Sequence, residues 1–457
     1  MSAPTAERAA AVAQLRERIA RLGGAAGSTA PRPRPRHDPD AVATRRAESA
    51  RRGGFEPHPE GDGVAWVRRV SIDLGPFLER AGAPGPATAG QLIRLALGDP
   101  GPHTPRWDAS AAAVLDLETL GLRGSGVLAF LAGVGIPRGD RLEVDQVLLV
   151  DPADERAALL ALLGRLAGHR VLVTYNGRSF DVPALRSRLV VNRLDGAVLE
   201  SGLHCDVLAP VRRLFRDRLG ACTLGRAERD LLGFVRHGEV PGSEAPARYQ
   251  AWLRGAGYEV LEGVVIHNQL DLCGTMVLAA RLAAHLEGDM VSPVHPADRY
   301  RLAVHLARTG IADSVDEHLR ATVDGRRGPW DRHAAHALAA RLRRRGGVAE
   351  AEAVEILAGL WRSRPGDLRA ARALAVSLER LRRHPEALAV AERALELCSR
   401  LEGWRLAAAR GAPTGGWVAD WERRRRRLRG RIAAGQSPPP GPAPGAGVVD
   451  PAPLLAN

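Results

Sequence analysis

The sequence has no lysine and only four cysteines, and each shortage narrows the class of protein. The cysteines form no CxxC pair, which excludes a zinc ribbon and a disulfide framework and favours a reducing compartment. Because lysine is absent, all 65 residues counted as lysine or arginine are arginine. Aromatic residues make up only 4% of the chain. This usage is typical of a very GC-rich genome, so basic composition alone is a weak guide to function.

Long apolar runs are also missing from the 457 residues. No stretch approaches the roughly 18 apolar residues that a membrane span needs, so we expect no membrane partner. The N-terminal segment MSAPTAERAAAVAQLRERIARLGG is interrupted by charges every few residues, which predicts no signal peptide. We therefore expect a cytoplasmic protein.

The charge is strongly one-sided, with a formal net charge of +13 and a pI of about 10.9. Such a balance favours polyanionic partners, nucleic acid first, because arginines neutralise phosphates and release counterions. The alternative is a solvated arginine surface that follows from codon usage. Charge alone leaves both open.

Composition and periodicity divide the chain into five predicted segments. These are an N-terminal helix and disordered linker (1–61), a lead-in segment (62–109), a main domain (110–288), helical repeats (296–402), and a basic and Pro-rich tail (403–457). The linker prediction depends on the tract GGAAGSTAPRPRPRHDPD, which has too little apolar surface to fold.

The main domain begins with strand-like runs and ends with helical ones. AAAVLDLET, GVLAFLAGVGI and LEVDQVLLVD predict three strands, and HRVLVTYN predicts a fourth after an intervening helix. The second half is helical in pattern, with two helices expected within 257–286. This order predicts an α/β fold with a mixed sheet flanked by helices.

The segment 296–402 is all helical in pattern and repeats itself. Ala353 and Ala387 occupy matching places 34 residues apart, and Pro365 ends one repeat. The period resembles the tetratricopeptide pattern of helix–turn–helix units. A repeat domain of this kind predicts a protein partner.

Acidic side chains occur in three motifs of the main domain, one at a strand end and two on predicted helices. Asp116 and Glu118 are two apart in a strand, so both carboxylates point to the same side. Asp181 comes near the N-terminus of a helix, and His267 and Asp271 lie four apart on one helix face. Paired carboxylates are costly without a cation, and hard oxygen ligands suit Mg²⁺ or Mn²⁺.

Each motif also has a purely structural interpretation. Asp116 and Glu118 are compatible with an ordinary strand end, and Asp181 with simple stabilisation of a helix N-terminus. His267 taken alone is more often an interior or surface histidine. The motifs become specific only in combination.

Five motifs follow one another in a characteristic order. DLETLGL, YNGRSFDVPALRSRL, HCDVLAPVRRLF, TLGRAERDLLGF and HNQLDL resemble the YprB-type ribonuclease-H-like family, which is part of the DEDD 3′–5′ exonuclease superfamily. The resemblance covers about residues 110–288 and implies a ribonuclease-H-like sheet. The four defining acids of the superfamily fall on Asp116, Glu118, Asp181 and Asp271.

The resemblance implies two-metal hydrolysis of phosphodiester bonds. The four acids would hold two Mg²⁺ or Mn²⁺ ions about 3.5–4 Å apart, and His267 would orient or deprotonate the attacking water. One departure concerns His267, which lies four residues before Asp271, the spacing of the tyrosine subgroup rather than of the histidine subgroup. Asp206 in HCDVL is an extra acid, either an outer group of the site or a helix cap.

Further residues are candidates to bind the nucleic acid. The backbone around Thr119 and Leu120 and the side chain of Asn176 are candidates to position the terminal nucleotide, the alternative for Asn176 being a plain turn residue. Phe180 is a candidate to position that nucleotide by stacking on its base, or else packs in the core. Arg178 is a candidate phosphate ligand or an exposed arginine. The block ERRRRRLRGR at 422–431 is a second electrostatic candidate, the alternative being a solvated helix or tail.

The sequence therefore predicts a metal-dependent nuclease, a 3′–5′ exonuclease on single-stranded DNA or RNA. The alternative is a nucleic-acid-binding scaffold or adaptor, with a catalytically silent fold and protein-binding repeats. A polymerase proofreading subunit is disfavoured because the expected histidine spacing is absent.

Overall fold

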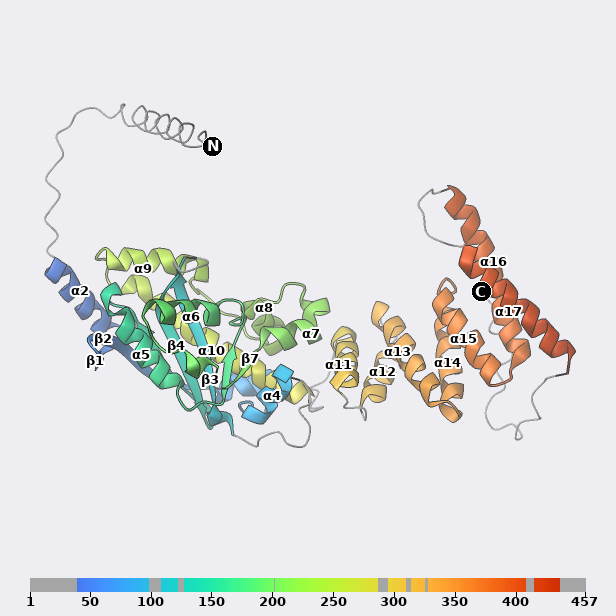
Figure 1. The fold of residues 1–457 in the computed structure, drawn as a ribbon, viewed down its shortest axis with the longest axis horizontal. Helices are drawn as coiled ribbons and strands as arrows, with labels where there is room; N and C mark the ends of the chain where they lie inside the picture. Colours follow the sequence, from blue (N-terminus) through green and yellow to red (C-terminus); the bar gives the residue numbers. More distant parts are fainter. Residues whose placement is uncertain are drawn as a thin grey trace, which may run out of the picture.

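The computed structural model shows a sheet domain followed by a line of helices (Figure 1). It describes residues 39–97, 108–121, 127–200, 202–286, 295–309, 314–324, 328–407 and 415–435. The N-terminal helix predicted before residue 23, most of the predicted linker, and the tail beyond residue 435 lie outside these ranges. No helix within them combines the length and the apolar character needed to cross a bilayer.

The sheet has seven strands in the order β1-β2-β5-β4-β3-β6-β7. Pairs from β1 to β3 along this order are antiparallel, and the β3–β6 and β6–β7 pairs are parallel. The predicted mixed α/β sheet is confirmed. The strands are β1 (Glu56–Glu60), β2 (Gly63–Asp73), β3 (Ala112–Leu120), β4 (Leu128–Arg138), β5 (Arg141–Leu148), β6 (Val171–Thr174) and β7 (Leu203–Asp206).

Helices and short turns cover the sheet. The helices of this domain are α2 (Pro39–Arg52), α3 (Gly75–Ala81), α4 (Ala89–Leu97), α5 (Glu155–Leu166), α6 (Asp181–Val191), α7 (Leu208–Leu219), α8 (Leu224–Ala227), α9 (Ala245–Leu253) and α10 (Glu259–Leu286). The short turns are η1 (Ala109–Ala111), η2 (Pro152–Asp154), η3 (Ala197–Leu199), η4 (Glu228–Leu232) and η5 (Gly242–Glu244).

Side chains of β3 point alternately to the two faces of the sheet, and this alternation determines which face carries the candidate site. Leu115 and Leu117 pack into an apolar cluster with α5 and α6 on one face. Val114 packs on the other face into the cluster that contains Leu272 of α10. Because side chains two apart share a face, Asp116 and Glu118 point toward α10. The run AAAVLDLET is apolar on both faces because both faces are covered.

Two predicted boundaries are wrong at the N-terminal side. Residues 39–61, predicted as disordered linker, form α2 and β1, and Phe55 is fully buried. The predicted lead-in at 62–109 contains β2, which pairs with β5 along eight residue pairs and so belongs to the same sheet. Proline content favoured a linker, but it did not indicate that Ala50 of α2 packs in one apolar cluster with Trp252 of α9.

A third prediction to fail concerns α10, which is one continuous helix of 28 residues rather than two. Helix α10 carries His267 and Asp271 near its middle and buried apolar residues in its C-terminal half. One rigid element therefore runs from the candidate site to the region where the helical line begins.

The C-terminal part is all helical within the described ranges, as expected. Each helix packs against the next, and α11 also packs against α7 of the sheet domain. Ala353 and Ala387, the matching positions of the predicted repeat, are both fully buried. The tetratricopeptide assignment stays a prediction. The helices are α11 (Pro296–Thr309), α12 (Val315–Asp324), α13 (Pro329–Arg345), α14 (Val348–Ser363), α15 (Leu368–Arg380), α16 (His384–Ala407) and α17 (Gly415–Ala433).

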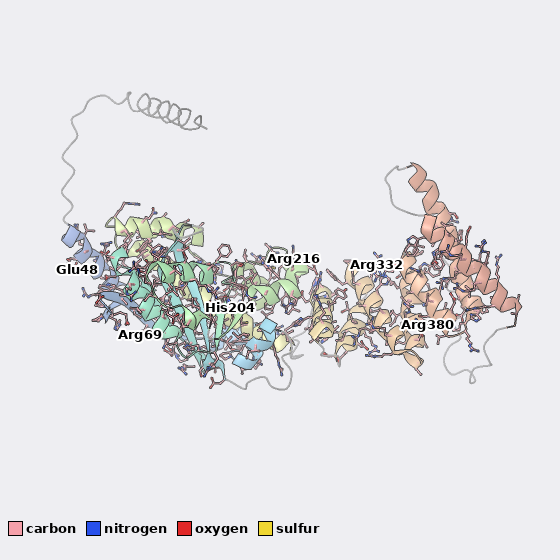
Figure 2. The ribbon with its side chains drawn as sticks, in the orientation of Figure 1. Glu48, Arg69, His204, Arg216, Arg332 and Arg380 are labelled. Carbon is pink, nitrogen blue, oxygen red and sulfur yellow. The ribbon has the colours of Figure 1, made fainter. Side chains whose placement is uncertain are left out.

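The predicted basic tail contains a packed helix, α17, over residues 415–433. Trp421 is fully buried against the preceding helices, and Arg424 is only 9% exposed. Arg424, Arg427 and Arg431 all pair with Glu379 of α15. The arginine block is thus partly neutralised within the chain. Figure 2 shows labelled arginines on both parts of the molecule, from Arg69 on the sheet to Arg380 on the helical line.

Candidate active site

Asn268 of α10 anchors the helix against the strand that carries the first acids. Its amide Nδ2 donates to Asp116 Oδ2 at 2.8 Å and to the Asp116 carbonyl oxygen at 3.2 Å. Gln146 donates in turn to Asn268 Oδ1 at 2.9 Å. The close approach depends on Gly133 of β4, because a Cβ there would lie 2.2 Å from Asn268 Oδ1. These contacts fix the register of α10 over β3.

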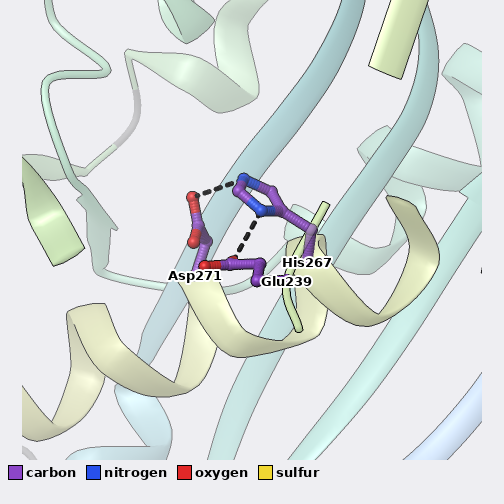
Figure 3. A group of neighbouring side chains, drawn as sticks. All are labelled: Glu239, His267 and Asp271. Atoms are coloured by element: carbon purple, nitrogen blue, oxygen red, sulfur yellow. Dashed lines mark ion pairs between the residues drawn. The ribbon is translucent and has the colours of Figure 1, made fainter. Parts of the chain in front are cut away.

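His267 lies between three carboxylates, two of which, Glu239 and Asp271, are drawn with it in Figure 3. Its Nε2 is 3.5 Å from Asp271 Oδ2 and 3.8 Å from Glu118 Oε1. Glu239 Oε1 lies 2.7 Å from Nδ1, a charge-pairing distance, although Nδ1 has no well-aligned hydrogen bond to any described residue. One ligand atom each of Glu239, His267 and Asp271 lies within 4.8 Å of the others.

Asp181, the first residue of α6, completes the cluster. Burial raises the pKa of its carboxyl to about 7, opposed by the backbone N–H groups of Asp181 itself and Leu117, which donate to it. The charges of Asp206 and Asp271 raise this pKa further. The helix N-terminus therefore offsets only part of the cost of placing this acid beside others.

The charges of the four acids act on one another. Burial holds the pKa of Asp116 well above its usual range, and the carboxylates of Asp271, Asp181 and Glu118 raise it further. Burial, followed by the charges of Asp271 and Asp181, raises the pKa of Glu118 to about 8. Asp116 and Glu118 therefore both lie within electrostatic range of Asp181 and Asp271. A set of hard oxygen donors that destabilise one another fits Mg²⁺ or Mn²⁺, whose charge would offset the repulsion.

Arg236 stabilises the far side of this cluster. Its guanidinium is 7% exposed and donates to Asp271 Oδ1 at 2.6 Å and to Glu228 Oε1 at 2.6 Å, and it also pairs with Glu239. Asp271 therefore has one oxygen held by Arg236 and the other turned toward His267. Asn268, the neighbour of His267, and the pair Arg236 and Glu239 were not singled out from the sequence. The loop that carries Arg236 and Glu239 has no periodic pattern that would have marked them.

Asp206 is engaged mainly by backbone groups. Its carboxylate accepts the N–H groups of Asn176 at 2.8 Å, Arg178 at 3.1 Å and Leu208 at 3.1 Å. This matches the capping alternative, while its charge still reaches Asp181. Asn176 has a φ of 67°, a left-handed conformation that asparagine tolerates in turns.

The other predicted nucleic-acid ligands lie at the rim of the acids. Phe180 directly precedes Asp181 and is 51% exposed, so it is not a core residue. Thr119 and Leu120 end β3 just past an irregularity in its pairing with β4. The Arg178 guanidinium donates to the carbonyl of His204 at 3.3 Å.

The fold is that of a ribonuclease-H-like domain. Residues 113–283 match a family model described as the RNase_H superfamily. The chain is also similar to "Uncharacterized protein YprB" of Bacillus subtilis (strain 168), with 31% identity over 189 residues. That match covers 41% of this chain and 46% of the relative, so it concerns less than half of either protein.

Proposed function

We propose that the protein is a metal-dependent nuclease that hydrolyses phosphodiester bonds in single-stranded nucleic acid. The observation that carries this proposal is that the charge of Asp271 raises the pKa of three other buried acids, Asp116, Glu118 and Asp181. A ribonuclease-H-like domain supports a nuclease-type activity, and the DEDD resemblance supports 3′–5′ polarity.

Each side chain of the cluster has a distinct task in this proposal. The four carboxylates hold the divalent cations, and Asn268 and Arg236 fix the orientations of Asp116 and Asp271. Bound Mg²⁺ or Mn²⁺ would supply Lewis-acid stabilisation and an activated water. His267 presents Nε2 toward Glu118 and Asp271, where it can accept a proton from that water.

Glu239 supports His267 in this task. A carboxylate beside Nδ1 favours the proton on that nitrogen and leaves the Nε2 lone pair free as the base. Phe180, exposed at the rim, offers a face on which a terminal base can stack. Stacking of this kind is independent of sequence and requires an unpaired base, which supports a single-stranded substrate.

The test is a time course with end-labelled single- and double-stranded DNA and RNA in the presence of Mn²⁺. We expect a ladder of products shortened from the 3′ end with wild-type protein. Asp116→Asn and Asp271→Asn should each lower the rate by at least about 100-fold. Glu56→Gln, which removes an exposed carboxylate on β1, should leave it unchanged.

Two results would count against the proposal. If no strand is cut under any condition, or if Asp116→Asn cuts as fast as wild type, the nuclease assignment fails. Binding of oligonucleotides without turnover that depends on divalent cations would instead favour the scaffold alternative.

A further inference from the structure

Besides the arginine block of α17, a second group of arginines lies in the sheet domain. It is separate from the acid cluster. A hollow of about 190 Å³ opens between α2 and the C-terminal end of α9. Its lining includes four guanidinium-bearing side chains and no carboxylate; we call it the arginine pocket. The arginines are Arg45, Arg46 and Arg52 from α2 and Arg254, which directly follows α9.

The floor of the arginine pocket is rigid. Trp252 is fully buried beneath it and donates its indole N–H to Ser49 at 2.9 Å, which ties α9 to α2. Ala50 of α2 and Trp252 share one apolar cluster with Phe130 of β4. The guanidinium groups therefore project from packed helices, and their closeness is imposed by the fold.

The charge of the pocket is only partly balanced. Arg46 pairs with Asp151 at 3.0 Å. Within the described ranges, Arg52 and Arg254 make no ion pair with a carboxylate. Like charges held this close repel one another unless an anion enters, and a guanidinium binds phosphate oxygens in a bidentate manner. Such a lining is chemically suited to phosphate oxygens.

Helix α9 links the pocket to the acid cluster. Gly242, in the turn before α9, lies so close to His267 that a Cβ on it would be 3.5 Å from Nε2. Arg254 follows the last residue of α9. With a rise of 1.5 Å per α-helical and about 2 Å per 3₁₀ residue, this segment spans at most about 20 Å. A stacked strand advances about 3.4 Å per nucleotide, so the pocket lies within about six nucleotides of His267.

We propose that the arginine pocket binds backbone phosphates of a single strand whose end lies at the acid cluster. This inference rests on the proposed function for the identity of the polyanion. A strand with its 3′ end at His267 would place phosphates several nucleotides upstream in the pocket. Strands too short to span α9 would not reach it.

The test measures binding of fluorescently labelled single strands of 3 and 12 nucleotides by anisotropy. It uses the full chain carrying Asp116→Asn in EDTA, so that no strand is cut. The pocket variant is Arg52→Gln with Arg254→Gln, both exposed side chains. The matched control is Arg138→Gln with Arg216→Gln, which removes the same charge; Figure 2 shows Arg216 on α7, away from the end of the domain that carries Glu48 of α2.

We expect the pocket variant to weaken binding of the 12-mer by about 10-fold and of the 3-mer by less than 2-fold. The slope of log K against log salt should fall by about 1.4 for the 12-mer, because two single-strand phosphate contacts are lost. The control should weaken both strands by less than 3-fold, and unchanged thermal unfolding should accompany each variant.

Three results would overturn the inference. These are equal losses for the two strand lengths, equal losses in the control, or tighter binding of inorganic phosphate or a nucleoside monophosphate than of the 12-mer. The last would make the pocket a small-molecule site. Because cleavage plays no part, length-dependent binding through the pocket would stand even if the nuclease assay failed, and the reverse also holds.

Discussion

Asp116 and Asp206 are both carboxylates shielded from solvent, but their surroundings differ. Asp116 accepts one side-chain hydrogen bond, from Asn268, and is repelled by three other acids. Asp206 accepts three backbone N–H groups that hold a turn and the start of a helix. An acid that the fold destabilises is a candidate for function, and one that the fold stabilises is part of the structure.

Matched substitutions should therefore have opposite effects on stability. We expect Asp116→Asn to raise the free energy of unfolding by about 0.5–2 kcal/mol in EDTA at pH 8, because it removes a repelled charge. Asp206→Asn should lower it by about 1–3 kcal/mol, because an amide replaces one acceptor with a donor. Denaturant unfolding measures both. A loss of stability in Asp116→Asn would contradict the assignment of strain to the cluster.

The raised pKa values also set a dependence on pH. Burial and neighbouring acids raise the pKa of Glu118 to about 8 and of Asp181 to about 7, from ordinary values near 4. The folded chain then holds protons that the unfolded chain has lost. The stability from these groups is complete below about pH 4 and is lost as pH rises through 7 and 8.

A cation in the cluster would offset that loss, so its effect should grow with pH. We expect Mg²⁺ to raise the unfolding temperature more at pH 8.5 than at pH 6, as measured by calorimetry. In Glu118→Gln with Asp181→Asn, the difference between the two pH values should largely disappear. An equal Mg²⁺ effect at both pH values in wild type would count against these carboxylates as ligands.

Among the secondary-structure elements, α17 shows how an arginine run becomes part of a folded helix. The buried Trp421 and Leu428 set its inner face, and Glu379 lies opposite three of its arginines. Because Glu379 of α15 pairs with three of its arginines, the arginine run of α17 is part of the folded core of the helical region and not a free basic tail. This pairing also leaves this segment a weaker nucleic-acid candidate than its sequence suggests.

Loss of the Glu379 carboxylate should lower the stability of the folded chain. We expect Glu379→Gln to lower the free energy of unfolding by about 3 kcal/mol, because Arg424 is left nearly buried without its partner. Glu392→Gln, which breaks the exposed pair with Arg429, should change it by less than about 1 kcal/mol. Equal effects in urea unfolding would mean that the Glu379 contacts are solvent-screened.

The sequence correctly predicted those elements that a short stretch of residues is enough to indicate. The apolar run of β3 and the spacing of Asp116 and Glu118 predicted a strand with both carboxylates on one side, and the structure has that strand. Residues in α2 and α17 were assigned to linker and tail because proline and arginine content outweighed a few apolar positions. Glu239 and Arg236 could not be predicted from the sequence, because they matter only through contacts between α10 and a loop of irregular pattern.

For the molecule as a whole, the sheet domain and the helical line meet at α7, α10 and α11. Arg218 of α7 pairs with Asp298 of α11 at 2.7 Å. Burial lowers the pKa of His285 on α10 to about 3 and of His305 on α11 to about 4. Burial also raises the pKa of Asp298 to about 7. The stability contributed by Asp298 therefore falls as pH rises, whereas that of the two histidines rises.

The two histidines predict that acid weakens this junction. Because their pKa is lower in the folded chain, their contribution is complete above about pH 6.5 and is lost as pH falls toward 4. We expect amide exchange in α11 to accelerate between pH 6.5 and 5, after correction for intrinsic rates. His285→Leu should flatten this dependence, whereas the exposed His237→Gln should not. No change in α11 across this range would contradict the expectation.

The proposed nuclease activity requires that the four carboxylates hold divalent cations. Titration of Mn²⁺ into metal-free protein at pH 8 by calorimetry tests this most directly. We predict saturable binding by wild type and by Glu56→Gln, and loss of at least one site in Asp116→Asn and in Asp271→Asn. Binding that is absent in wild type, or unchanged in both variants, would contradict it.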